Sequence, residues 1–393
     1  MNDPGPPPPF HTRLPFHIRA VFLAFPFVLF VALLAVVEVV TRWTLPHLST
    51  LDFFVSAARQ QAQFVDAAHV RITEGDPLLF WRLRPNLRDV LWDATRVTTN
   101  AQGLRYDHAV GRKAPDAFRI VCVGDSVTFG YRVPRVYVRR PRENPEWLPY
   151  PALLERWLRG ANPGRAVEVI PLATPGYSSH QGLAWLRREI GRLDADVVTV
   201  CFGWNDIDLR ARSDAQSMKT DWLTVTARRI VSQSQALMHA SRWLRSKRAR
   251  REPMPDSVRR VSSERFVDNE LEMARLAREH RAAAVLIGPV YRDRVAHPPE
   301  GDVVGAYRDA LRVAAREAGI PYLEVHELTE AAYPGNARLF EEHIHPNQRG
   351  HRLLAVALLG FLRDHGLLQD LAVPTMAPAG HDDGEEAPPG PQP

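Results

Sequence analysis

The chain of 393 residues contains only two cysteines, Cys122 and Cys201. Two cysteines are too few for a disulfide scaffold or a four-cysteine zinc site, so both classes are excluded. An excess of one charge sign is also missing, because 50 Lys and Arg against 45 Asp and Glu give a net charge of only +5. This balance gives no support for a protein that binds nucleic acid over its whole surface. The 45% hydrophobic share suffices for a buried core, and the length suggests two or three domains.

One long apolar run stands near the N-terminus. Residues 1–17 are rich in proline, and we expect them to be disordered. Residues 18–41 follow, and about 20 apolar residues in a helix cover the ~30 Å hydrocarbon core of a bilayer. They therefore predict a transmembrane anchor, because a cleaved signal peptide has a shorter apolar stretch and a buried core helix is not expected at the extreme N-terminus.

The basic residues beside this run favour one orientation of the anchor. Arg13 and Arg19 precede its uncharged part, Ala20–Val37, and Arg42 follows it, which by a small margin places the N-terminus in the cytoplasm and the rest outside, in the periplasm. The scarcity of cysteine is consistent with an oxidising compartment. At the other end, residues 371–393 are rich in proline, glycine and acidic residues, and we expect a disordered tail.

Between residues 116 and 370, apolar β-branched runs alternate with amphipathic segments. The runs predict five buried strands, at 118–123, 167–172, 196–202, 283–288 and 321–325. The amphipathic segments predict helices at 150–158, 179–193, 266–280, 304–318 and 350–365. Such alternation is typical of an α/β fold with a doubly wound parallel sheet, in which ligands bind beyond the carboxyl ends of the strands.

The segment ahead of this domain, residues 42–115, has mixed signals. Trp81–Pro85 and Val97–Arg105 have the pattern of a small extended element with a turn at Gly103. The pattern is compatible with a stalk or linker and with a cap that packs on the domain.

Polar motifs occur where the strands end or the last helix begins. They are Gly124-Asp125-Ser126, Pro175-Gly176, Gly203-Trp204-Asn205-Asp206 and Glu341-Glu342-His343-Ile344-His345-Pro346. In this order they resemble the motifs of the SGNH, or GDSL-type, hydrolase family, over about residues 116–368. The resemblance implies a flavodoxin-like five-stranded sheet and a serine esterase without metal or organic cofactor. More loosely, the anchor and the extended segment behind it resemble membrane-tethered bacterial members.

The resemblance also implies a role for each motif residue. Ser126 would be the nucleophile, His345 its general base and Glu342 the carboxylate that orients the imidazole. The backbone N–H groups of Ser126 and Gly176 and the side-chain amide of Asn205 would form the oxyanion hole. The family normally has aspartate three residues before the histidine, so the longer Glu342 is a departure that puts the orienting bond in question.

Alternatives remain for several of these residues. Ser126 is also compatible with a helix cap, and His343 with His345 is compatible with half of a zinc site. Cys122 and Cys201 lie on strands that are neighbours in the family's sheet. They are compatible with two buried thiols and with a disulfide, whose geometry is demanding. A Gly-x-Ser-x-Gly elbow is absent, which argues against the α/β-hydrolase class.

The positive charge is concentrated in one insert, residues 209–262. Residues 210–260 hold 13 Lys and Arg and 4 Asp and Glu, a local charge of +9, so the rest of the chain is net acidic. Apolar residues alternate with arginines, which predicts amphipathic helices, and Lys247–Arg251 is a cationic cluster. The insert is compatible with a solvated helical cap and with a lid that meets anionic lipid or an acidic polymer.

These features predict a membrane-anchored serine esterase that hydrolyses O-acyl esters of an envelope glycan or a lipid through an acyl-enzyme. An O-acyltransferase with the same triad and a catalytically silent glycan- or lipid-binding module are the alternatives. No nucleic-acid partner is expected, and the oligomeric state is left open.

Overall fold

The computed structural model describes residues 16–57, 69–135, 147–249, 257–292, 302–332 and 337–375. At its centre is a parallel sheet with the strand order β11-β10-β7-β5-β6. The strands are β5 (Phe118–Gly124), β6 (Val167–Ala173), β7 (Val197–Cys201), β10 (Ala283–Ile287) and β11 (Tyr322–Leu323). Numbered along the chain, the spatial order is 2-1-3-4-5, which is the flavodoxin-like order. The predicted five-stranded, doubly wound sheet is confirmed.

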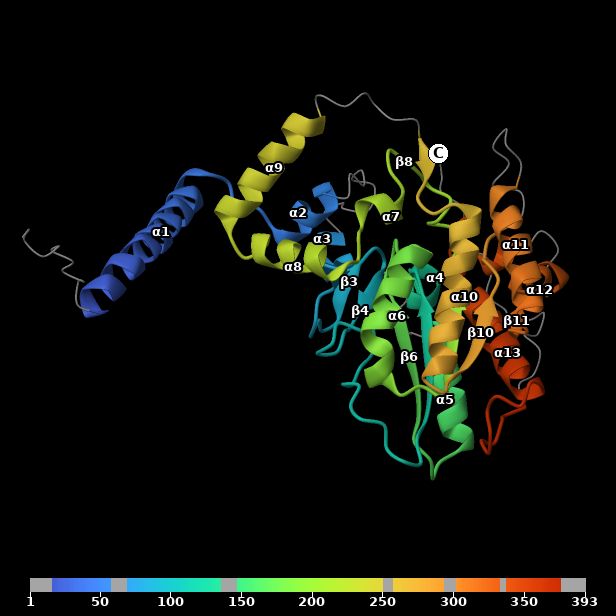
Figure 1. Ribbon diagram of the computed structural model, residues 1–393. Coiled ribbons are helices and arrows are strands. Elements are labelled where there is room, and N and C mark those ends of the chain that lie inside the picture. The colour runs from blue at the N-terminus through green and yellow to red at the C-terminus, as the bar shows by residue number, and fades with distance from the viewer. Residues whose placement is uncertain are drawn as a thin grey trace, which may run out of the picture.

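Helices cover both faces of this sheet (Figure 1). On one face lie α6 (Ser179–Leu193), α10 (Ser263–Glu279) and α11 (Val303–Glu317), and on the other α5 (Tyr150–Ala161) and α13 (Gln348–Asp364). The five predicted helices are confirmed. The helices α10 and α13 start a few residues earlier than predicted, because the Ser262 and Asn347 side chains cap them by accepting hydrogen bonds from backbone N–H groups of the first turns. The predicted strand 321–325 is too long, because Val325 begins α12 (Val325–Ala332).

Of the segment predicted as a linker or cap, residues 45–57 and 69–115 form a cap on the domain. The cap contains α2 (Thr50–Ala57), α3 (His69–Ile72) and two hairpins, β1 (Thr73–Asp76) with β2 (Phe80–Leu83) and β3 (Val90–Trp92) with β4 (Thr95–Val97). Trp81 donates its indole N–H to the Pro175 carbonyl, so the cap touches a loop of the sheet domain directly. The predicted turn at Gly103 is confirmed, since the Gly103 N–H donates to the Asn100 carbonyl and Gly103 has a φ of 74°. The extended part is shorter than predicted, because β4 ends at Val97.

The N-terminal apolar segment is one helix, α1 (Phe16–Thr44), which starts earlier than predicted and includes the last two residues of the expected disordered segment. Within it, Ala24–Thr44 is long and apolar enough to cross a membrane, and none of this stretch is buried by the rest of the chain. The prediction of a disordered tail over 371–393 is wrong at its start, because Leu371 is buried in the core and the Ala372 N–H donates to the Asn162 side chain at 2.8 Å. The other terminal residues predicted to be disordered, 1–15 and 376–393, lie outside the described residues.

The insert contains the predicted helices, α8 (Trp222–Val231) and α9 (Gln235–Ala249), together with α7 (Asp214–Ser217) and the short pair β8 (Leu209–Arg210) and β9 (Val258–Arg259). Figure 1 shows α1 projecting from the body beside α9. The contact is specific, because the Glu38 carboxylate accepts hydrogen bonds from the backbone N–H groups of Gln235 and Ala236 at the start of α9. Residues 250–256, which include the end of the cationic cluster, are outside the described residues.

Candidate active site

Ser126 lies directly beyond the end of β5, at the switch point of the sheet between β5 and β7. It is the first residue of the short helix α4 (Ser126–Phe129), and Asp125 caps this helix by accepting a hydrogen bond of 2.9 Å from the Val127 N–H. The turn requires glycine at position 124, because a Cβ there would lie 2.0 Å from Thr128 Oγ1 and 2.9 Å from the Cys201 carbonyl. The tight exit from the strand therefore places the Ser126 hydroxyl at the carboxyl edge of the sheet.

His345 and Glu342 complete a chain of hydrogen bonds with this serine. His345 Nε2 lies 2.8 Å from Ser126 Oγ, and His345 Nδ1 is hydrogen-bonded to Glu342 Oε1. The glutamate, one methylene longer than the aspartate usual in this place, therefore reaches the imidazole. Burial raises the pKa of Glu342, but the hydrogen bond and charge of His345 and the charge of His343 outweigh burial, so that pKa lies below its ordinary value.

The segment that carries the imidazole is held by its own backbone. The N–H of Glu341 donates to the His345 carbonyl at 2.8 Å, and Phe340 and Pro346 form an antiparallel bridge. Asn347 then caps α13 and so joins this loop to a helix that packs on the sheet. The short loop leaves His345 little freedom to move away from Ser126.

Asn205 is buried beside the serine turn. Its side-chain amide donates to Asp125 Oδ2 at 3.1 Å, which ties the loop after β7 to the residue before Ser126. Burial raises the pKa of Asp125 to about 6, although the bonds from Val127 and Asn205 and the charge of His345 act in the opposite direction. Asp125 thus positions two neighbours of the serine and makes no bond to His345.

Gly176 lies in the loop after β6, the neighbour of β5. The registers pair Gly124 with Ala173 and with Cys201, so the loops that carry Ser126, Gly176 and Asn205 leave the same edge of the sheet. Gly176 has a φ of 81°, a conformation that L side chains rarely adopt.

Two residues of this site carry no signal in the sequence. The fully buried Arg260 donates to the Gly176 carbonyl at 3.0 Å and pairs with Asp214 at 2.9 Å, which fixes the loop of Gly176. It is one of 13 Lys and Arg residues between 210 and 260, and nothing local distinguishes it from the others. Likewise, the Tyr131 ring packs against the His345 ring with 4.2 Å between centroids, although it belongs to no motif.

His343 is placed differently from His345. Its Nδ1 lies 3.2 Å from Glu342 Oε2, its ring packs against Trp204, and no contact joins it to Ser126 within the described residues. Among those residues, no group of three or more His, Cys, Asp or Glu side chains is arranged to hold a metal ion. Cys122 and Cys201 are both buried and free, and burial raises the pKa of the Cys122 thiol to about 12.

The chain is similar to one family of known proteins. The model of the GDSL-like Lipase/Acylhydrolase family matches residues 122–353, more than half of the chain. Solved structures similar to this chain include a lipase/acylhydrolase from Enterococcus faecalis, 17% identical, with a TM-score of 0.40 over 66% of this chain and 100% of that one. Another is the acetylxylan esterase Axe2 from Geobacillus stearothermophilus, 15% identical, with a TM-score of 0.42 over 64% of this chain and 95% of that one. No curated protein sequence matches the chain.

Proposed function

Because this chain belongs to the GDSL-like lipase/acylhydrolase family and is an SGNH-type serine esterase, we propose that it cleaves O-acyl esters of an envelope glycan or of a membrane lipid through an acyl-enzyme. The observation that carries this proposal is the 2.8 Å contact between Ser126 Oγ and His345 Nε2, with Glu342 behind the imidazole. A serine hydroxyl is a weak nucleophile at neutral pH, and an adjacent base of this kind activates it.

The first half of the reaction forms the acyl-enzyme. Ser126 Oγ attacks the ester carbonyl while His345 Nε2 takes the hydroxyl proton, and Glu342 stabilises the resulting imidazolium. When the tetrahedral intermediate collapses, the bond to the alcohol oxygen breaks and His345 returns the proton to that oxygen. The alcohol, a sugar or glycerol hydroxyl, leaves, and the acyl group stays on Ser126.

Negative charge develops on the carbonyl oxygen during this attack. We assign its stabilisation to the backbone N–H groups of Ser126 and Gly176 and to the side-chain amide of Asn205. Support comes from the shared sheet edge of the three loops and from the hydrogen bond that holds Asn205 against Asp125. A donor aimed at the developing oxyanion in advance typically contributes ~10²–10³ in turnover.

The second half of the reaction releases the acyl group. A water molecule attacks the acyl carbonyl, His345 takes its proton, and the carboxylic acid leaves as Ser126 regains a proton. If a sugar hydroxyl attacks in place of water, the same residues perform acyl transfer. Measuring free acid against acylated glycan product with a glycan acceptor present separates the two reactions.

The proposal includes a membrane location for this chemistry. Support comes from α1, whose apolar side chains are exposed between Ala24 and Thr44, and from Trp43, which is 87% exposed at its end. Tryptophan is enriched at membrane–water interfaces, and the hydrogen bonds of Glu38 join this end of α1 to α9. A periplasmic catalytic domain is tested by protease treatment of intact spheroplasts, which should degrade it only when it lies outside the cytoplasm.

The serine chemistry is tested with purified protein and p-nitrophenyl acetate. We expect turnover by the wild type, loss of turnover in Ser126→Ala, and labelling by a fluorophosphonate only when Ser126 is present. Labelling of Ser126→Ala at the wild-type rate contradicts the assignment, and absence of wild-type turnover favours a silent binding module.

A further inference from the structure

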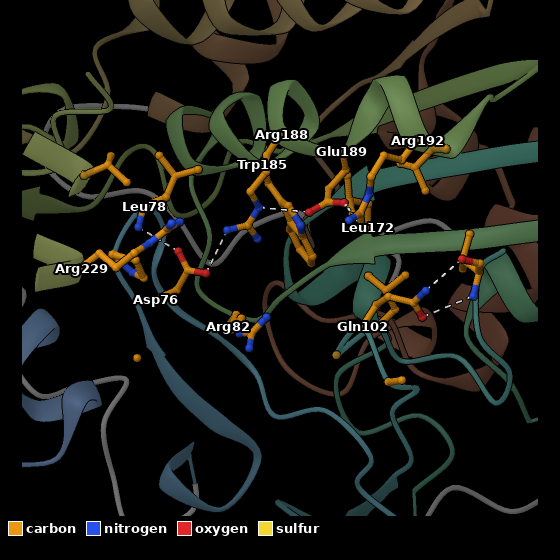
Figure 2. A pocket seen from close by; sticks show the side chains of 18 of the residues that line it. Asp76, Leu78, Arg82, Gln102, Leu172, Trp185, Arg188, Glu189, Arg192 and Arg229 are labelled. Atoms are coloured by element: carbon orange, nitrogen blue, oxygen red, sulfur yellow. Dashed lines mark hydrogen bonds and ion pairs between the residues drawn. The ribbon is translucent and has the colours of Figure 1, made fainter. Parts of the chain in front are cut away.

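A cleft of about 1080 Å³ lies away from the catalytic serine, between the cap, the loop before β5, α6 and α8. Neither Ser126, His345 nor Asn205 lines it. Figure 2 shows its walls, with Asp76 and Arg82 from the cap, Arg188 from α6 and Arg229 from α8. The catalytic reaction proposed above makes no use of this space.

The walls of the cleft carry more arginines than carboxylates, although Arg82 pairs with Glu74 behind the wall at 2.6 Å. The lining contains five arginines and two carboxylates, a net charge of +3, and its ionised residues are Arg82, Arg112, Arg188, Arg192, Arg229, Asp76 and Glu189. The chain outside the insert is net acidic, and of the five arginines only Arg229 belongs to the insert. A basic cleft here is therefore not a simple consequence of composition.

Part of this charge is held in fixed positions. Figure 2 shows Arg188 between two carboxylates, 2.9 Å from Asp76 Oδ2 and 3.1 Å from Glu189 Oε1. Asp76 also accepts 2.8 Å hydrogen bonds from two backbone N–H groups. Because Asp76 is itself anchored, the Arg188 guanidinium is held in a fixed orientation in the cleft wall.

Two further arginines are not neutralised. Arg112, before β5, and Arg229, on α8, are exposed side chains of the cleft wall. Within the part of the chain that the structure describes, neither guanidinium makes a hydrogen bond or an ion pair. A free guanidinium is suited to bind a carboxylate or a phosphate through two parallel hydrogen bonds.

We propose that this cleft binds an acidic oligosaccharide, with its carboxylate or phosphate groups on Arg112 and Arg229. The volume is large enough for several sugar units, and the neutral polar side chains of the wall, Thr50, Gln102, Ser232 and Gln233, suit sugar hydroxyls. The choice of a glycan rests on the proposed function, and the cleft then holds a stretch of the polymer away from the acyl ester.

The test uses the full chain in neutral detergent and isothermal titration calorimetry. The probes are tetragalacturonate, the uncharged cellotetraose and inorganic phosphate. We expect tetragalacturonate to bind, the affinity to fall with added salt, and cellotetraose to bind far more weakly. The double variant Arg112→Gln/Arg229→Gln should lose about tenfold in affinity, whereas Arg265→Gln/Arg316→Gln, which removes two exposed arginines outside the cleft, should not.

Equal binding of both tetrasaccharides, or affinity unchanged in the cleft variant, overturns the proposal. Binding to vesicles of phosphatidylglycerol without binding of tetragalacturonate also overturns it and assigns the charge to lipid headgroups. If phosphate binds as tightly as tetragalacturonate, the cleft holds a single anion, which contradicts the assignment of an oligosaccharide as its ligand. Since binding is measured without turnover, its outcome is independent of the Ser126 assay, and thermal unfolding confirms that each variant folds.

Discussion

Replacing Glu342 by glutamine tests the most unusual residue of the proposed triad. The substitution preserves the shape of the side chain and removes its charge, so the imidazolium formed during the attack loses its partner. A hydrogen bond to a charged group contributes ~1.5–3 kcal/mol. At ~1.4 kcal/mol for each factor of ten, kcat should fall about 10- to 100-fold.

This loss should appear in kcat with little change in KM. Glu342 contacts His345 and His343, so in our assignment it acts through the imidazole and not on the substrate. Loss of the nucleophile in Ser126→Ala should be more severe, ~10⁴-fold or more. Initial rates with p-nitrophenyl acetate over a range of concentrations separate kcat from KM.

Glu342→Asp is the matched variant, because it keeps the charge and shortens the side chain by about 1.5 Å. The Glu341 N–H to His345 carbonyl bond limits how far the loop can shift to compensate. We therefore expect a rate between those of the wild type and Glu342→Gln. A Glu342→Gln rate equal to that of the wild type would refute the orienting role of this carboxylate.

Three further predictions concern neighbouring groups. His345→Ala should abolish esterase activity while His343→Ala keeps most of it, and the reverse result in the same assay reassigns the base. Asn205→Ala should lower kcat ~10²–10³-fold with the fold intact by circular dichroism, and a change confined to KM argues against a place in the oxyanion hole. Glu270 is buried without a hydrogen-bond partner for either oxygen, and burial raises its pKa well above 4.5. The folded state therefore holds a proton that the unfolded chain releases, so wild-type stability should fall as the pH rises above about 4.5, and Glu270→Gln should gain in Tm over the wild type between about pH 5 and pH 8. A constant difference in Tm across that range shows that Glu270 does not titrate in this way.

Much of the fold follows from local pattern. The apolar runs of β5, β6, β7 and β10 are each long enough for a strand that is covered on both faces of the sheet. In the helices, the spacing of the apolar residues shows which side packs on the sheet. Caps such as Ser262 and Asn347 shift helix starts by a few residues, because a hydrogen bond from a single side chain decides them. The shortest strand of the central sheet, β11, is the least accurately predicted of its five strands, since two residues carry almost no periodic signal.

Local sequence pattern is enough to predict the order of strands and helices and the positions of Ser126, Gly176, Asn205 and His345 at their ends. Both the element order and these positions depend on the period of hydrophobic residues and on short motifs, which involve residues close together in the chain. Contacts between distant parts of the chain make residues 45–57 and 69–115 a cap, fix Arg260 on the Gly176 loop, and bring arginines of the cap, α6 and α8 around one cleft. Arg260 and Gly176 are separated by 84 positions, and no local pattern records which of many similar arginines will fold against a given carbonyl.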